Sequence, residues 1–399
     1  MVQRIQKPAF LAWPICQEIL SNAATLGSEA RFVGGAVRNH LLGKPVDDVD
    51  MAVTAPITLI ADKLKQAGLA VYETGIDHGT ITVRYKQHIV ELTQTRIDTK
   101  TDGRHAVVRP VDDWLEDAKR RDFTINAFYM NGDGVLFDPL DAMVDLETGI
   151  LRFIGNPDRR IQEDYLRIMR GFRLVAEYPE LRLSEAGIAA IKRHLNGLDR
   201  LSGERVTTEW VRLVSAHGWR HALHLAETAG LTQKLLGVTT KIKLTASYGE
   251  SLTALGRFAW QLGPGARIPA WVRLSRADTE LLDLYLDKLD SDVVEALLAD
   301  KHWQQAAYQL GAEAYQRLLL FLLWEAETAD TDRLNQLATY QPPTFPLRGA
   351  DLITIGVAPG VGLGQILLSL EDKWVKSDFQ FSKDELIAHA RSIRDEQPR

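Results

Sequence analysis

The sequence has very little cysteine, no long apolar run and no excess of basic residues. Its single cysteine, Cys16, excludes internal disulfides and any zinc site built from several cysteines. The longest uninterrupted apolar run covers the seven residues Leu318–Trp324, whereas a membrane-spanning helix needs roughly 18 or more. The N-terminal stretch lacks the apolar core of a secretory signal, so we expect none. These absences favour a cytoplasmic protein with no membrane association.

Basic residues are too few for a protein that coats nucleic acid. The chain has 47 Lys and Arg against 53 Asp and Glu, a formal net charge of −6. Proteins that bind nucleic acid without specificity are usually basic overall. Binding to nucleic acid would therefore need a local basic surface.

The length and the pattern of the 399 residues indicate a folded chain of two or three domains. Short β-type segments alternate with a helical stretch up to about residue 153, and strand signals nearly vanish from about residue 158. We therefore predict an α+β fold, in which a mixed α/β domain precedes an all-helical remainder. The predicted strands are 31–33, 50–53, 80–83 and 89–92, and the main predicted helices are 57–67, 161–178, 184–195, 204–229, 279–298 and 304–328.

A glycine pair follows the first predicted strand, in the run Val33-Gly34-Gly35-Ala36-Val37-Arg38. Glycines allow a phosphate to approach backbone amides, and the start of a helix favours negative charge. Arg38 could add a bidentate contact to a phosphate. A plain tight turn is the alternative interpretation of the glycine pair.

Two aspartates about ten residues further on favour the phosphate-binding interpretation of this loop. Asp48 and Asp50 are two positions apart, so on a strand both carboxylates point to one face. Such a pair repels itself unless a cation neutralises it, and Mg²⁺ takes carboxylate and phosphate oxygens together. Alone, the pair would be a solvated turn, but after a glycine-rich loop it predicts metal-assisted phosphoryl transfer. Glu91, in the predicted strand 89–92, is a candidate third catalytic carboxylate, or else an exposed strand residue.

Two arginine-rich motifs follow. The first, Arg120–Ala127, suits contacts to a triphosphate and a ribose, although a charged turn is equally compatible. The second, Arg159–Arg173, places Asp164 and Arg167 three positions apart, which makes them neighbours on the predicted helix. A surface ion pair is one interpretation. The other is a base reader, in which the carboxylate accepts from the exocyclic amine of C or A and the arginine donates to the adjacent ring acceptors.

Together these motifs resemble the class II tRNA nucleotidyltransferase family, the CCA-adding enzymes, whose relatives include bacterial poly(A) polymerases. The family pattern G-G-x-V-R-D with D-x-D, R-R-D-x-x-x-N and E-D-x-x-R-x-x-R-x-x-R is matched here in order. The matching segments are Gly34–Asn39 with Asp48–Asp50, Arg120–Asn126 and Glu163–Arg173. Each fragment is weak by itself, but the ordered set is specific.

The resemblance implies a catalytic head (1–155), a neck with a base-reading helix (156–230) and a tRNA-binding body and tail (231–399). It also implies that the 3′ hydroxyl of tRNA attacks the α-phosphate of CTP or ATP and releases pyrophosphate, with no obligate protein partner. Asp48 and Asp50 would hold Mg²⁺, and the segment 98–114 would be the family's flexible loop. The implied nucleotide-binding residues are Gly35, Arg38, Arg121, Asp164, Arg167, Arg170 and Arg173.

The chain departs from the family pattern at two places. Asn39 stands where the family usually has Asp, and the segment Asp138–Leu146 lacks two glycines of a family motif. The motifs do not separate full CCA addition from addition of CC alone, addition of A alone or poly(A) synthesis. A catalytically silent tRNA-binding protein would be expected to lose the aspartate pair, which is intact here.

Overall fold

In the computed structural model the chain divides into two compact units, which we describe separately. The first comprises Met1–Thr239 with Trp271–Arg273, and the second Thr240–Ala270 with Leu274–Arg399. The structure describes residues 2–4, 7–101, 106–237, 252–287, 304–305, 308 and 340–396. The break between the units lies close to the predicted start of the body at residue 231. The division between head and neck at residue 155 falls inside the first unit and stays a prediction.

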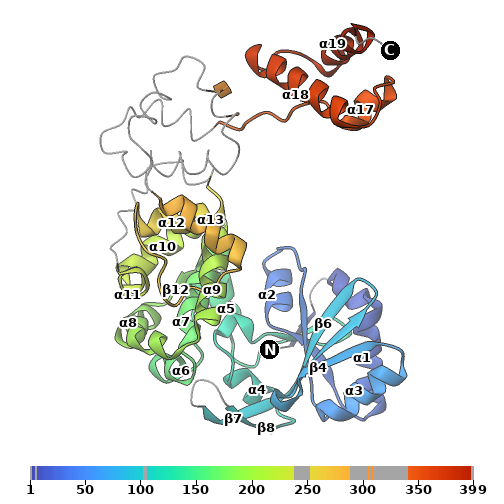
Figure 1. Ribbon diagram of the computed structural model, residues 1–399. Coiled ribbons are helices and arrows are strands. Elements are labelled where there is room, and N and C mark those ends of the chain that lie inside the picture. The colour runs from blue at the N-terminus through green and yellow to red at the C-terminus, as the bar shows by residue number, and fades with distance from the viewer. Residues whose placement is uncertain are drawn as a thin grey trace. The chain divides into compact units, whose positions relative to one another are not determined.

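A mixed sheet forms the centre of the head (Figure 1). Its described strands follow the order β1-β10-β9-β2-β3-β6-β5-β4, and β3 and β6 pair in parallel whereas the other neighbours are antiparallel. The strands are β1 (Val2–Arg4), β2 (Ala30–Val33), β3 (Val49–Val53), β4 (Ala70–Gly75), β5 (Thr80–Tyr85), β6 (His88–Gln94), β9 (Tyr129–Met130) and β10 (Val135–Phe137). Helices α1 (Pro14–Thr25) and α3 (Ile57–Gln66) pack against this sheet.

The sheet forms where the sequence predicts buried strands. All four residues of β2 are buried, and in β3 only Asp50 is exposed. Apolar β-branched residues fit such a two-sided buried strand. The predicted segment 98–114 contains a hairpin of β7 (Arg96–Thr101) and β8 (Ala106–Pro110), and residues 102–105 between them lie outside the described part. The head also holds α2 (Gly35–Leu41), α4 (Trp114–Lys119), α5 (Met143–Glu147) and the 3₁₀ turns η1 (Ala9–Ala12), η2 (Ile76–His78) and η3 (Thr124–Asn126).

Helices dominate the chain after the head, which confirms the predicted α+β class. In the first unit these are α6 (Pro157–Glu163), α7 (Leu166–Glu177), α8 (Glu185–His194), η4 (Leu195–Arg200), α9 (Gly203–Ser215), α10 (Trp219–Thr228) and α11 (Leu231–Leu236), with a short pairing of β11 (Ile150–Leu151) and β12 (Arg182–Leu183). The second unit contains α12 (Ala254–Leu262), α13 (Arg276–Leu286), α17 (Gly349–Thr354), α18 (Val361–Lys376) and α19 (Lys383–Glu396). The last three share a core around Trp374 and Leu386.

Two helices that the sequence predicts as continuous are interrupted. The expected helix 161–178 breaks at Asp164, whose backbone is extended (φ −154°, ψ 106°). The expected helix 204–229 breaks at 216–218, where the Gly218 amide donates to the Ala176 carbonyl. A Cβ on Gly218 would lie 2.8 Å from that carbonyl oxygen, so only glycine allows α10 to approach the end of α7 this closely. The predicted segment 304–328 lies almost entirely outside the described residues, as does the end of 279–298.

None of the helices in the described part is long and apolar enough to cross a bilayer.

Candidate nucleotide site

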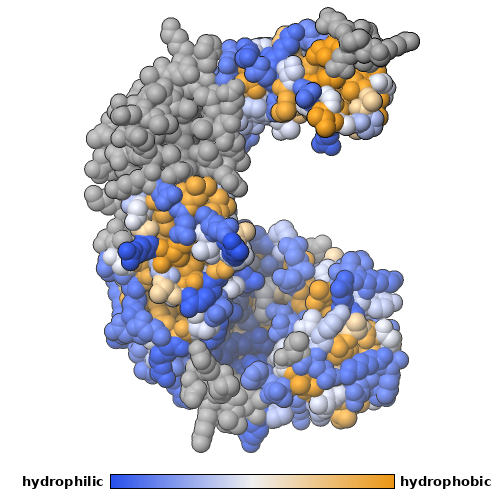
Figure 2. All heavy atoms as spheres, viewed as in Figure 1, coloured by the Kyte–Doolittle hydropathy of each residue, from blue (hydrophilic) through white to orange (hydrophobic). Residues whose placement is uncertain are grey.

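A pocket of about 720 Å³ in the first unit collects nearly all the residues that the sequence motifs single out. Nine arginines and six carboxylates line it, so it is locally positive within an acidic chain. Such a surface attracts polyanions. Figure 2 shows the hydrophilic surface of the recess beside the head. The lining residues are Gly34, Gly35, Arg38, Asn39, Asp47, Asp48, Asp50, Arg96, Arg120, Arg121, Asp122, Asn126, Asp164, Leu166, Arg167, Arg170, Arg173, Glu177, Tyr178, Arg205 and Arg212.

The glycine turn sits directly beside the aspartates. Gly34 follows β2 with φ +71°, a conformation that favours glycine, and α2 begins at Gly35. β2 and β3 pair so that Val33 lies opposite Asp50. A Cβ on Gly34 would lie 3.6 Å from Asp50 Oδ2. The sheet register therefore brings the first two sequence motifs to one wall of the pocket.

Asp48 and Asp50 both face this pocket, although only Asp50 belongs to β3 and Asp48 directly precedes it. The Asp50 side chain opens onto the pocket, but the surrounding walls withhold water from its carboxylate, and this desolvation raises the pKa of Asp50 to about 6. The charges of Glu91 and Asp48 add to the shift, and those of Arg121 and Arg170 oppose it. Glu91 is the register partner of Asp50 on β6, but it is not among the pocket-lining residues. Two crowded carboxylates offer the hard oxygen donors that Mg²⁺ prefers, so the residues fit this ion. Within the described part of the chain, no group of three or more His, Cys, Asp or Glu side chains forms a metal site, and the role of Glu91 stays a prediction.

Arg121 is fixed by a buried carboxylate that the sequence analysis missed. Its Nη2 donates to Asp117 Oδ2 (3.0 Å), and its Nε donates to the Tyr129 hydroxyl (3.1 Å). Arg120 Nε donates to the other oxygen of Asp117 (2.8 Å). Burial alone would raise the pKa of Asp117, but the two guanidinium groups outweigh it and hold that pKa below its usual range. The spacing of Asp117 from the two arginines, three and four positions, is the sequence signal for this contact.

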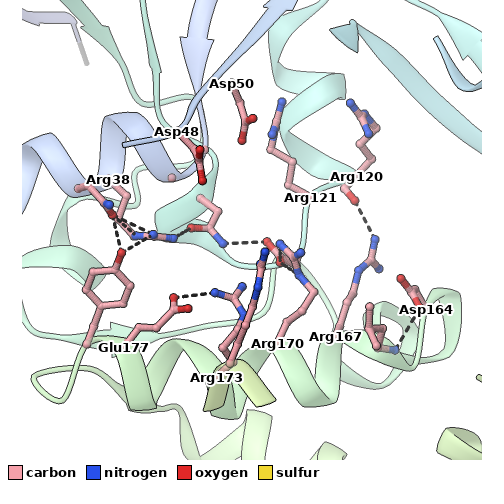
Figure 3. Close-up of a pocket in the computed structure, with 18 of the residues that line it drawn as sticks. Arg38, Asp48, Asp50, Arg120, Arg121, Asp164, Arg167, Arg170, Arg173 and Glu177 are labelled. Atoms are coloured by element: carbon pink, nitrogen blue, oxygen red, sulfur yellow. Dashed lines mark hydrogen bonds and ion pairs between the residues drawn. The ribbon is translucent and has the colours of Figure 1, made fainter. Parts of the chain in front are cut away.

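A polar chain connects the head to α7. Arg170 donates to Asp122 Oδ2 (2.7 Å), and Asp122 Oδ1 accepts from Asn126 Nδ2 (3.1 Å). Asn126 Oδ1 in turn accepts from Arg38 Nη1. Figure 3 labels Arg38 and Arg170, with Asp48 and Asp50 above them in the view. The R-R-D-x-x-x-N motif therefore bridges the glycine-turn arginine and the arginine run of α7.

The expected pairing of Asp164 with Arg167 is wrong in its local geometry. Asp164 lies between two helices, where its Oδ1 accepts from the Leu166 amide (3.1 Å) and its Oδ2 from Arg205 Nη2 (2.8 Å). An extended residue cannot follow the i,i+3 geometry of a helix. Both side chains still line the pocket, so they can act on one base without touching each other.

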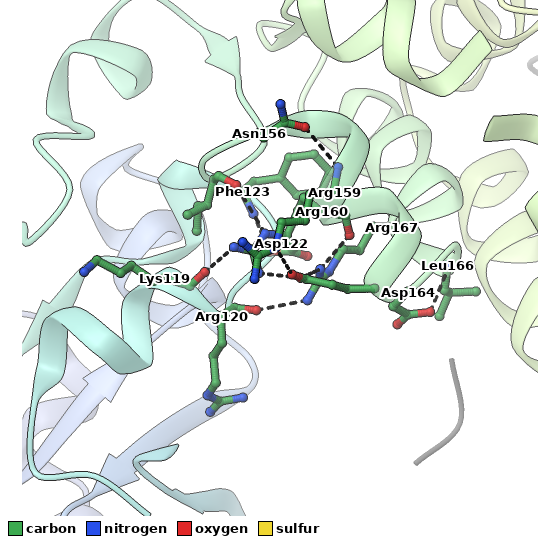
Figure 4. A network of polar contacts seen from close by, with 12 residues as sticks. Lys119, Arg120, Asp122, Phe123, Asn156, Arg159, Arg160, Asp164, Leu166 and Arg167 are labelled. Carbon is green, nitrogen blue, oxygen red and sulfur yellow. Dashed lines mark hydrogen bonds and ion pairs between the residues drawn. The ribbon is translucent and has the colours of Figure 1, made fainter. Parts of the chain in front are cut away.

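Arg167 is held in place by contacts that leave part of its guanidinium unused. Its Nη1 donates to the Arg160 carbonyl (2.7 Å) and to Glu163 (2.8 Å), and its Nη2 donates to the Arg120 carbonyl (2.9 Å). These bonds, drawn in Figure 4, use three of the five donors of a guanidinium. The remaining two donors suit the two adjacent acceptors of a base edge.

Arg173 is more fully engaged. It forms ion pairs with Glu177 and Glu209, both at 2.6 Å, and it is buried. These contacts favour a role of Arg173 in bracing the helix. Its contact with a nucleotide stays a prediction.

Comparison with known proteins agrees with this architecture. A family model described as "Poly A polymerase head domain" matches residues 30–152, and one described as "Probable RNA and SrmB- binding site of polymerase A" matches residues 180–241. The CCA tRNA nucleotidyltransferase 1, mitochondrial, of Danio rerio is 34% identical over 379 residues, which cover 90% of this chain and 86% of that protein. The CCA-adding enzyme of Enterococcus faecalis is 31% identical over 406 residues, 96% of each chain.

The solved structures give the same result. The crystal structure of Bacillus stearothermophilus CCA-adding enzyme in complex with CTP matches with a TM-score of 0.64 and 27% identity, over 96% of this chain and 98% of that one. The fold and the pocket thus define a nucleotidyltransferase of the polymerase-head type. The chain belongs to the family of CCA-adding tRNA nucleotidyltransferases. This confirms the resemblance inferred from the motifs.

Proposed function

We propose that this enzyme adds C, C and A to the 3′ end of tRNA, using CTP and ATP and releasing pyrophosphate. The single observation that carries this proposal is the convergence of the glycine turn, the aspartate pair and the arginines of α7 on one pocket. The membership of the family, over nearly the whole chain, supports it. The helices after residue 230 would then bind the tRNA.

In the proposed reaction, the arginines of the pocket bind the triphosphate and the aspartate pair binds the metal ion. Arg38, Arg121 and Arg170 provide positive charge for the triphosphate, and the acids that fix Arg121 and Arg170 prevent these side chains from collapsing onto the aspartate pair. Asp48 and Asp50 would hold Mg²⁺, which when bound activates the attacking hydroxyl and stabilises the leaving oxygen. The 3′ hydroxyl of the tRNA then attacks the α-phosphate, and pyrophosphate leaves.

Base selection needs no template in this arrangement. A carboxylate has about four acceptor sites, so Asp164 can accept from an exocyclic amine of C or A beside its bonds to Leu166 and Arg205. The two unused donors of Arg167 meet the ring acceptors next to that amine. Uracil and guanine present the opposite pattern and leave both groups unpaired, which is costly.

We place this enzyme in the cytoplasm, because its single cysteine suits a reducing compartment. Cys16 is buried in the head and takes no part in the site.

The decisive experiment is an extension assay with tRNA transcripts that lack CCA, end after the first C, or end in CC. We expect addition of CC with CTP alone and completion by a single A when ATP is added. Use of only CTP, or of only ATP on a CC end, would instead show a partial enzyme. A long A tail on unrelated RNA would show a poly(A) polymerase, and the absence of any addition would contradict the proposal.

A further inference from the structure

Arg38 differs from Arg121 and from the arginines 167, 170 and 173 in having only neutral hydrogen-bond partners. It is 6% exposed. Its Nε and Nη2 donate to Asn39 Oδ1 (3.2 and 2.9 Å), its Nη2 also donates to the Tyr178 hydroxyl (2.8 Å), and its Nη1 donates to Asn126. Among the residues that the structure describes, no ion pair includes Arg38, whereas Arg121, Arg167, Arg170 and Arg173 each contact a carboxylate.

This arrangement leaves a buried positive charge uncompensated. Buried charges in proteins are normally paired, because removal from water is costly. The four hydrogen bonds occupy four of the five guanidinium donors. Arg38 can therefore give a phosphate its full charge and one N–H bond, but the bidentate contact expected from the sequence would require it to leave its present partners.

Tyr178 holds this arrangement from a distant part of the chain. It caps the end of α7, 140 positions from Arg38, and is 8% exposed. Its hydroxyl accepts from Arg38 and donates to Asn39 Oδ1 (2.7 Å), and its ring lies 4.5 Å from Arg38 Cζ. One hydroxyl thus fixes both the guanidinium and the amide that faces it.

Asn39 and Tyr178 together form a clamp around the Arg38 guanidinium, and Asn39 adds no charge to it. Its Nδ2 donates to the Pro45 carbonyl (3.1 Å), which turns Oδ1 toward Arg38. An aspartate here, as in the family pattern, would neutralise the guanidinium. In this chain the holding groups are an amide and a phenol, and the charge of Arg38 remains available to an anion.

We propose that Tyr178 is a positioning residue for the triphosphate, acting with Asn39 through Arg38. The inference rests on the proposed nucleotidyl transfer and names a residue directly after α7 whose contribution is specific for phosphate. It predicts that loss of the Tyr178 hydroxyl weakens binding of anything that carries the pyrophosphate group, whichever base is attached.

The test is Tyr178→Phe, which keeps the ring and removes the hydroxyl. The loss of one hydrogen bond to a charged group is worth about tenfold in affinity. We expect the Kd of CTP, the Kd of ATP and the inhibition constant of inorganic pyrophosphate to rise by this common factor, of about ten. The preference for CTP over UTP should not change, because the hydroxyl acts on the phosphates and not on the base. Tyr72→Phe, at an exposed position of β4, is the matched control and should change none of these values.

A second pair of variants tests the same clamp with Tyr178 in place. Asn39→Ala should weaken pyrophosphate binding as Tyr178→Phe does, and the double variant should lose less than the product of the two effects. Asn39→Asp keeps the acceptor oxygen but neutralises the guanidinium, so it should also weaken pyrophosphate binding. Unchanged pyrophosphate binding in Asn39→Ala, or independent effects in the double variant, would overturn the positioning role.

The outcomes also separate this inference from the proposed function. If Tyr178→Phe binds pyrophosphate within twofold of the wild type, or weakens CTP without weakening pyrophosphate, the inference is wrong. If thermal unfolding shows that Tyr178→Phe does not fold, pyrophosphate binding by the single variants Asn39→Ala and Asn39→Asp tests the inference in its place. A wild-type protein that binds nucleotides but extends no tRNA would instead contradict the proposed function.

Discussion

Arg170 of α7 and Asp122 of the head form an ion pair of 2.7 Å in which the aspartate side chain is only 8% exposed. Asp122 also accepts from the Phe123 amide and from Asn126. The pair therefore ties α7 to the wall that the head contributes to the pocket.

Asp122→Ala should destabilise the first unit by about 3 kcal/mol, because it leaves a guanidinium and an amide without their buried acceptor. Urea unfolding followed by tryptophan fluorescence measures this change, since Trp210 and Trp219 are fully buried in the same unit. Asp158→Ala removes a more exposed partner of Arg193 and should cost less than about 1 kcal/mol. Equal losses in the two variants would show that burial does not set the strength of these pairs.

Asp122 should also make the free energy of unfolding depend on pH. Burial would raise the pKa of Asp122, but Arg170 and the hydrogen bonds from Asn126 and Phe123 outweigh it, so the pKa lies below its usual range. A depressed pKa contributes stability that is complete above the unfolded value of about 3.9 and is lost as the pH falls below it. The difference in unfolding free energy between the wild type and Asp122→Asn should thus be constant from pH 8 to 5 and shrink toward pH 3. A constant difference down to pH 3 would contradict the ionised, paired state.

Asp48→Asn and Asp50→Asn should each lower nucleotide addition by about 1000-fold or more, because the metal site would lose half of its carboxylate charge. Binding of tRNA, measured by gel shift, should remain within a few-fold of the wild type. Asp133→Asn, on an exposed turn, is the control. Substantial addition by either site variant would show that the pair does not hold the metal. Glu91→Gln, assayed in parallel, tests the third carboxylate.

Asp164→Ala should relax the choice of base more than it weakens binding of the triphosphate. Loss of the acceptor for an exocyclic amine removes the penalty against uracil, so the preference for CTP over UTP should fall by about tenfold or more. Competition between CTP and UTP in single-nucleotide addition measures it. Arg205→Ala frees one oxygen of Asp164 without removing the carboxylate, and it should keep the preference. If Asp164→Ala keeps the preference for CTP over UTP, Asp164 does not select the base.

Local patterns predicted the four strands because β2 and β3 are short, apolar and buried on both faces, whereas buried residues alternate with more exposed ones along β5 and β6. The glycine turn and the aspartate pair were found because each is a local signal, and the family motifs supplied their order. The break at Asp164 could not be found in this way, since an uninterrupted helical periodicity runs across it. The carboxylate of Asp164 instead accepts a hydrogen bond from Arg205, which lies 41 positions away in the sequence.

The supporting residues of the site were missed for a related reason. Asn126 belonged to a recognised motif, but its contact with Arg38 spans 88 positions. Tyr178 carries no signal at all, because a tyrosine at the end of a helix is ordinarily a core residue. Its two hydrogen bonds depend on how the end of α7 meets α2, and this is set by packing around Gly218 and the buried face of α7 rather than by any segment alone.

The pairing of β2 with β3 has a consequence for how this protein can be assayed during folding. Val33 lies opposite Asp50 in that pair, and a slip of one residue would turn the side chain of Asp50 to the other face of the sheet. A slipped head could still collapse and regain its helical circular dichroism. Only the correct register would restore nucleotide addition, so recovery of activity after dilution from urea counts molecules with a properly aligned sheet, not merely compact ones.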